Sequence, residues 1–275
     1  DILSGKFNIK RFNGTWRNDE SIIYKDRSGF LLKYNVHENR ADRLNIKEIQ
    51  FHYVSYEVSA DEQYVLLVKN YIKIFRHSFL AQYDILNLQT GIITELTINN
   101  KQEYLLMATW SPVGNALILN YDRNLYYKSS VFGKEIQLTN NQYFNGIPDW
   151  VYEEEVFNSN VAVWFSPDGN RIAFIQFDDS QTSLINIPIY GESGNMNFQY
   201  TKNRPIFYPK AGSKNPFVKL FYINLNDTHF LPYQIQAPEE LNTSEYIITV
   251  VSWVNNYKIL SIWMNRVQNM AIYYL

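Results

Sequence analysis

The chain has 275 residues, of which 46% are hydrophobic and 16% aromatic, and its formal net charge is −2. This length and apolar content can fill a large core, which excludes a disordered protein. The small net charge excludes a global basic field for nucleic acid, and the absence of cysteine excludes thiol catalysis and cysteine-bound zinc. Abundant Tyr and Phe, at 22 and 17 residues, favour β-structure.

A strand-turn-strand unit recurs along the chain, clearest at 108–119 and 163–174, with looser copies at 16–24, 58–67 and 253–261. In the two clear copies a Ser-Pro pair presets the turn, and a glycine supplies a positive φ. Ser111 follows Ser59 by 52 positions and precedes Ser166 by 55, a period typical of propeller blades. The sequence therefore predicts an all-β propeller of four-stranded antiparallel blades, with about five blades in residues 1–275.

Arg76 lies among aromatic residues, directly after the strand-like stretch 71–74. A guanidinium group at this position could donate hydrogen bonds to a ligand carbonyl or pair with acidic side chains. A structural ion pair between blades is an equally good interpretation of the same residue.

An acidic motif at 149–157 places Glu153, Glu154 and Glu155 in a row. Asp149 after a proline predicts the N-cap of a short helix that carries the three glutamates. Residues on an α-helix point about 100° apart, so only two neighbours can converge on one cation. A peptide N-terminus, with an ordinary pKa of about 7.7–8, is such a cation, although a solvated acidic face is the alternative.

An insertion over about 183–212 has strand-like ends around a turn-rich middle. We expect either a protruding β arm, which would suit a contact between subunits, or a long blade loop.

The first residues do not form a signal peptide, and no apolar run approaches the roughly 18 residues of a membrane-spanning helix. Candidate N-glycosylation triplets begin at Asn13, Asn226 and Asn242, in stretches that suggest turns or loops. These triplets favour an extracellular protein. The chain shows no Walker loop, Rossmann glycine pattern, His-Glu-x-x-His motif or nucleophile elbow, so we expect no catalytic residue, metal or cofactor in it.

Several of these stretches together resemble the N-terminal propeller region of the dipeptidyl peptidase IV group, within the prolyl oligopeptidase superfamily. They are the acidic motif at 149–157, the Phe-Arg-His-Ser-Phe run around Arg76, and the segments 110–114 and 208–212. The resemblance covers essentially the whole chain. It implies an eight-bladed propeller, of which about five blades are present, that caps an α/β-hydrolase domain absent from this sequence.

The resemblance also implies roles for individual residues. Glu154 and Glu155 would bind the free amino group of a substrate, while Glu153 faces elsewhere. Arg76 would hold the carbonyl of the second substrate residue, and the insertion would be a dimerisation arm. Asn158 departs from the pattern, since the family carries a smaller residue there.

The implied function is substrate recognition in a serine dipeptidyl aminopeptidase that releases Xaa-Pro or Xaa-Ala from peptides with a free N-terminus. Its catalytic triad would lie in the hydrolase domain. The implied protein is a homodimer, secreted or the ectodomain of a type II membrane protein. An alternative is an inactive homologue that serves as a binding protein or potassium-channel auxiliary subunit, and a third is a free-standing glycan- or peptide-binding propeller.

Overall fold

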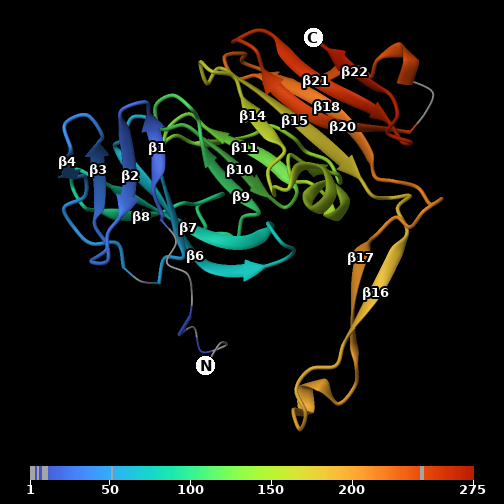
Figure 1. The fold of residues 1–275 in the computed structure, drawn as a ribbon, viewed down its shortest axis with the longest axis horizontal. Coiled ribbons are helices and arrows are strands. Elements are labelled where there is room, and N and C mark those ends of the chain that lie inside the picture. Colours follow the sequence, from blue (N-terminus) through green and yellow to red (C-terminus); the bar gives the residue numbers. More distant parts are fainter. Residues whose placement is uncertain (1–3, 5, 8–11, 51, 242–244) are drawn as a thin grey trace.

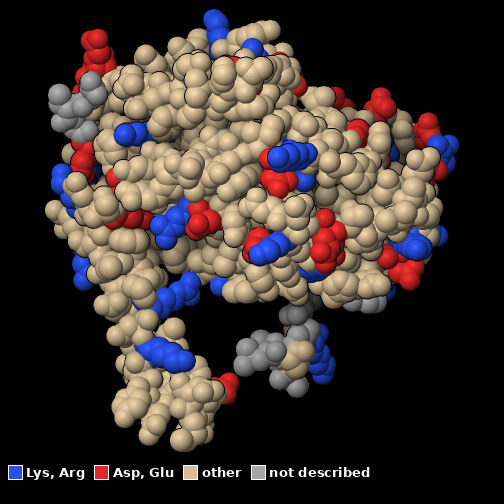
Figure 2. Space-filling model, turned by 180° about the vertical axis from the view of Figure 1, so that it is seen from behind, with Lys and Arg blue, Asp and Glu red and all other residues tan. Residues whose placement is uncertain are grey.

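The computed structural model describes residues 4, 6–7, 12–50, 52–241 and 245–275. Every strand pairing that it shows is antiparallel, and five sheets follow one another along the chain (Figure 1). A two-stranded arm projects away from these sheets (Figure 1), and most of the face of the arm that Figure 2 shows is uncharged. The predicted all-β fold of blade-like sheets is confirmed. None of the helices in the described ranges is long and apolar enough to cross a membrane.

Three four-stranded sheets form the N-terminal half. The first contains β1 (Thr15–Asn18), β2 (Ser21–Lys25), β3 (Leu31–Asn35) and β4 (Arg40–Arg43), in that order. The second contains β5 (Ser55–Val58), β6 (Tyr64–Lys73), β7 (Phe79–Asn87) and β8 (Ile93–Glu95). The third contains β9 (Met107–Trp110), β10 (Leu117–Tyr121), β11 (Asn124–Lys128) and β12 (Glu135–Gln137).

The C-terminal half carries the arm and the helices. The fourth sheet contains β13 (Phe144–Asn145), β14 (Val163–Phe165), β15 (Arg171–Asp178), β18 (Phe217–Asn224) and β19 (Tyr233–Ile235). The fifth contains β20 (Tyr246–Trp253), β21 (Ile259–Asn265) and β22 (Ala271–Tyr274). Between β15 and β18 the arm pairs β16 (Leu184–Ile189) with β17 (Lys202–Phe207). The helices are η1 (Tyr152–Phe157), η2 (Met196–Phe198) and η3 (Glu239–Leu241).

In each of three sheets a buried serine begins the turn between two paired strands: β5–β6, β9–β10 and β14–β15. The backbone N–H of Ser111 donates to the carbonyl of Ala116 at 2.8 Å, and Ser166 makes the equivalent bond to Arg171 at 2.8 Å. Gly169 follows with φ at +70°, which confirms the predicted positive-φ glycine. The Ser-Pro-x-Gly pattern therefore works through the backbone geometry of a tight turn.

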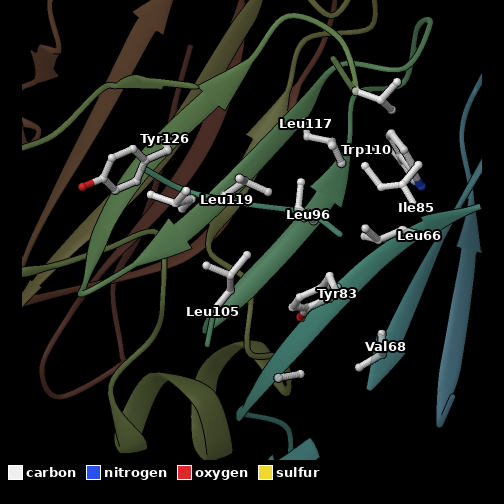
Figure 3. Packing of buried hydrophobic residues seen from close by; sticks show 13 residues of the cluster. Leu66, Val68, Tyr83, Ile85, Leu96, Leu105, Trp110, Leu117, Leu119 and Tyr126 are labelled. Atoms are coloured by element: carbon white, nitrogen blue, oxygen red, sulfur yellow. The ribbon is translucent and has the colours of Figure 1, made fainter. Parts of the chain in front are cut away.

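Successive sheets pack face to face. Side chains along a strand point alternately to the two faces of its sheet, and both faces are buried. In β6, Val65 and Leu67 pack with the first sheet, whereas Leu66 and Val68 pack with the third. Figure 3 shows the second of these clusters, in which Leu66 and Val68 face side chains of the third sheet. Each fully buried Leu or Val contributes about 1.5–3 kcal/mol relative to an exposed position. This packing makes the sheets a rigid support for the loops at their ends.

Tryptophan side chains also tie neighbouring sheets together. The indole N–H of Trp110 on β9 donates to the carbonyl of Glu57 on β5 at 3.0 Å. Trp253 on β20 makes the same kind of bond to the carbonyl of Trp164 on β14, at 2.9 Å. Strands β1, β5, β9 and β14 line one cavity of about 520 Å³, through Arg17, Val58, Trp110 and Val163 among others.

Two of the three glycosylation candidates can be placed. Asn13 and Asn226 are exposed, whereas Asn242 lies outside the described residues. Glycosylation at all three stays a prediction.

Candidate functional site

The acidic motif begins at Asp149, whose carboxylate accepts hydrogen bonds from the backbone N–H groups of Val151 at 3.0 Å and Tyr152 at 3.3 Å. These contacts confirm the predicted N-cap. Trp150 and Val151 are α-helical, but η1 then continues as a π-helix, so the expected α-helical spacing of the glutamates is wrong. A π turn contains more residues than an α turn, which places consecutive side chains closer in direction.

Tyr152 anchors the helix to the core. Its side chain is 2% exposed, and its hydroxyl accepts a hydrogen bond from the backbone N–H of Ile248 at 3.3 Å. Its ring also packs edge-on against Phe177, with the centroids 5.1 Å apart. One side chain therefore joins η1 to both the fourth and the fifth sheets.

Asn158 ends the helix in a left-handed conformation, with φ at +51°. Asparagine is among the few non-glycine residues that adopt this conformation readily. Its Oδ1 lies 3.0 Å from Nε2 of His77. Asn158 thus contacts the turn between β6 and β7.

Glu153 points into the protein and is completely buried. Its Oε1 accepts hydrogen bonds from the backbone N–H groups of His77 at 2.7 Å and Ser78 at 2.8 Å. Its Oε2 is also buried and has no hydrogen-bond partner among the described residues. The resemblance implied only that Glu153 faces elsewhere. No local pattern in the sequence indicates that it joins η1 to residues more than 70 positions away.

The tip of the β6–β7 hairpin, which we define as residues 74–78, is a tight turn closed by Ser78. Its carbonyl accepts from the backbone N–H of Ile74 at 2.9 Å, and its hydroxyl accepts from the N–H of Phe75 at 3.2 Å. The tip carries Arg76 and is the segment to which Glu153 binds. Figure 1 shows this hairpin reaching toward the helix between β13 and β14.

Arg76 and Glu154 meet at this tip. Nε of Arg76 lies 2.9 Å from Oε2 of Glu154, and the backbone N–H of Arg76 donates to Oε1 at 2.9 Å. The Glu154 side chain is only 8% exposed, whereas the Arg76 side chain is 65% exposed. The structure therefore brings together two of the three predicted binding residues and leaves the guanidinium accessible to a ligand.

Glu155 faces a different environment from Glu154. It is exposed and borders a cavity of about 600 Å³, and no salt bridge joins it to another described residue. Trp150 and Tyr208 line the same cavity with their ring centroids 4.7 Å apart. A carboxylate beside aromatic rings is suited to binding a cation.

The cap residue Asp149 interacts electrostatically with a second buried acid, Asp179. Asp149 and Asp179 are both buried, at 5% and 9% exposure. Burial, followed by the charge of Asp179, raises the pKa of Asp149. Burial, followed by the charge of Asp178, raises the pKa of Asp179. The cap of the glutamate-bearing helix is thus a carboxyl group that holds a proton more tightly than an ordinary aspartate.

This raised pKa predicts how stability depends on pH. An unfolded aspartate has a pKa of about 3.9, so above that pH the folded state binds more protons than the unfolded state. Binding of this proton stabilises the folded state. The stabilisation is complete below the pKa of the unfolded aspartate and is lost as the pH rises through the raised pKa of Asp149 in the folded state. Asp149→Asn keeps an oxygen acceptor for the cap but cannot titrate. We expect it to flatten the loss of stability between about pH 4 and pH 8, measured as the denaturant midpoint.

Asp19→Asn, which neutralises an exposed aspartate in the β1–β2 turn, is the control and should keep the wild-type pH dependence. Equal slopes for wild type and Asp149→Asn would show that the buried pair does not govern stability in this range.

Comparison with known proteins identifies the family. Residues 59–275 match the model of the dipeptidyl peptidase IV (DPP IV) N-terminal region. In solved structures, the chain superposes on dipeptidyl peptidase 4 of Porphyromonas gingivalis with a TM-score of 0.83 and 25% identity, over 99% of this chain and 39% of that one. This similarity confirms the predicted fold.

Curated relatives include both peptidases and an inactive protein. The chain is 36% identical over 280 residues to inactive dipeptidyl peptidase 10 of Rattus norvegicus, and 35% identical over 284 residues to dipeptidyl peptidase 4 of Felis catus. Prolyl endopeptidase FAP of Homo sapiens is 32% identical over 280 residues. Each alignment covers 99% of this chain but only 34–36% of the relative, so the chain spans about a third of their length. The chain belongs to the family of the dipeptidyl peptidase IV N-terminal region.

Proposed function

We propose that this chain is the substrate-recognition part of a serine dipeptidyl aminopeptidase, which releases Xaa-Pro or Xaa-Ala from the N-termini of peptides. The observation that carries the proposal is the Arg76–Glu154 pair, together with the exposed carboxylate of Glu155, which follows Glu154 in the chain and borders a cavity. Relatives named dipeptidyl peptidase 4 support it. The serine, aspartate and histidine of the reaction would belong to a catalytic domain outside this chain.

The charges of the site suit a peptide N-terminus. Glu154, Glu155 and Arg76 together carry one net negative charge, which a single ammonium group would balance. The ammonium group is largely protonated near neutral pH and has three N–H donors to share between two carboxylates.

Arg76 supplies the third point of attachment in this proposal. Its Nε is bound to Glu154, and its exposed guanidinium retains further N–H groups for a substrate carbonyl. Fixing both the amino group and a carbonyl sets the register of the peptide, so that only the bond after the second residue reaches the nucleophile. Such positioning lowers the barrier by removing motional freedom before the reaction.

The amine-binding role predicts a large loss of activity when the carboxylates are neutralised. In the full-length protein, Glu154→Gln and Glu155→Gln should each lower kcat/KM for a Gly-Pro chromogenic amide about 30-fold or more, since each removes a charged partner of the ammonium group. An N-acetylated substrate should resist wild-type enzyme, because acetylation removes the charge.

Glu95→Gln is the matched control, since Glu95 is an exposed glutamate on β8 in the second sheet. It should retain wild-type kinetics. Undiminished turnover by both Glu154→Gln and Glu155→Gln would refute amine binding by these residues.

A second candidate is a catalytically inactive binding or channel-modulating protein. It is favoured by the relative named inactive dipeptidyl peptidase 10, which is as similar to this chain as the peptidases are. The peptidase and the inactive protein would differ in the nucleophile motif of the catalytic domain. A Gly-x-Ser-x-Gly nucleophile motif in the full-length sequence supports the peptidase, and its loss supports the inactive protein.

We also propose that the arm binds a second copy of this protein. Its exposed large apolar side chains are Leu184, Ile187, Ile189, Tyr190, Met196, Tyr200 and Phe207. Tyr190 and Tyr200 are 73% and 81% exposed, and they lie on the same arm as the other exposed apolar side chains. Apolar surface that gathers on one exposed element is typical of an interaction site.

Replacing both tyrosines with serine should therefore weaken the dimer. We expect the full-length variant to sediment as a monomer at micromolar concentrations where the wild type sediments as a dimer. Val113→Ser, at an apolar residue that is 53% exposed in the turn between β9 and β10, is the control. A wild-type protein that is monomeric, or a double variant that dimerises as tightly as wild type, would contradict the proposal.

A further inference from the structure

The arm contacts the hairpin tip that carries Arg76. Nη2 of Arg204, on β17, donates a hydrogen bond to the backbone carbonyl of Ile74. The same guanidinium lies over the ring of Phe75, 5.5 Å from its centroid. Ile74 and Phe75 directly precede Arg76, whereas Arg204 is 130 residues from Ile74 in the sequence.

The tip is therefore supported on two sides. On the helix side, Glu153 accepts from two backbone N–H groups, and Glu154 accepts from the backbone N–H of Arg76. On the arm side, Arg204 binds the carbonyl that precedes these residues. The glutamates thus accept hydrogen bonds from N–H groups of the tip, and Arg204 donates one to a carbonyl group of the tip. Together they satisfy both kinds of polar group in the same short stretch of backbone. The position of the Arg76 side chain depends on this backbone.

Arginine is well suited to this contact. Its planar guanidinium can donate in its own plane while its face covers an aromatic ring, which a lysine ammonium cannot do. In the antiparallel arm, Arg204 pairs with Ile187, in the middle of the hairpin rather than at its base. A contact at this point transmits a displacement of the arm to the tip.

We propose that Arg204 is a positioning residue that couples the arm to the substrate site by holding the tip in place for Arg76. This inference rests on the proposed function for its effect on substrate binding. It also gives the arm a regulatory role, because any partner that changes the arm's position changes the support of Arg76. By linkage, substrate bound at Arg76 would favour the arm position that makes the Arg204 contact.

The test compares Arg204→Ala with Lys202→Ala in the full-length protein. Lys202 is the matched control, since it has the same charge, lies two residues away on β17 and contacts Phe198 of the arm rather than the tip. Amide hydrogen exchange of peptides covering 73–79 should be about threefold to tenfold faster in Arg204→Ala and unchanged in Lys202→Ala. Arg204→Lys should give an intermediate rate, because it keeps a cationic donor without the planar face.

Steady-state kinetics give the second readout. Arg76 would bind the substrate carbonyl before and during the reaction, so a poorly held tip raises KM more than it lowers kcat. We expect KM for a Gly-Pro amide to rise about threefold to tenfold in Arg204→Ala, with kcat within about twofold of wild type. Sedimentation of wild type and variants at the assay concentration checks that their dimer fractions are equal.

The outcomes separate this inference from the proposed function. Unchanged exchange at 73–79 and unchanged KM in Arg204→Ala would overturn the coupling, even where Glu154→Gln abolishes turnover. A wild-type protein without peptidase activity would refute the proposed function. Hydrogen exchange would then still decide whether Arg204 holds the tip.

Discussion

The candidate site depends on the buried carboxylate of Glu153. Taking a carboxylate out of water costs several kcal/mol unless hydrogen bonds replace those of the solvent. Glu153 receives two such bonds, from the N–H groups of His77 and Ser78, and bonds to a charged acceptor are stronger than neutral ones. Both hydrogen bonds go to Oε1, and they can form together only when the hairpin tip lies at one position against η1. The interaction therefore fixes where Arg76 lies.

The propeller sheets make this interaction possible. The sheets pack with both strand faces buried, and indole hydrogen bonds link β9 to β5 and β20 to β14. This packing holds the β6–β7 hairpin and the helix in a fixed relation. Tyr152 anchors η1 from the opposite side. On this frame Glu154 holds Arg76 and Glu155 remains open to the cavity. A rigid scaffold that presents loop residues is the usual arrangement for binding sites.

Local patterns in the sequence were sufficient for the all-β class, the serine turns and the Asp149 cap, because period, turn chemistry and capping are properties of neighbouring residues. The sequence suggests that Arg76 could pair with acidic side chains but does not name Glu154 as the partner, and the resemblance assigns both residues to a ligand. The burial of Glu153, the π winding of η1 and the Asp149–Asp179 pair were not foreseen. Each depends on tertiary contacts between distant segments, which no local pattern specifies.

Hydrogen exchange at the backbone amides of His77 and Ser78 tests the role of Glu153 most directly. In the full-length protein, Glu153→Ala should speed exchange of these two amides at least about tenfold, since it removes their buried acceptor. Glu155→Ala, on the same helix but with its side chain exposed, should leave them at the wild-type rate. Wild-type exchange in Glu153→Ala would contradict the conclusion that this carboxylate positions the site.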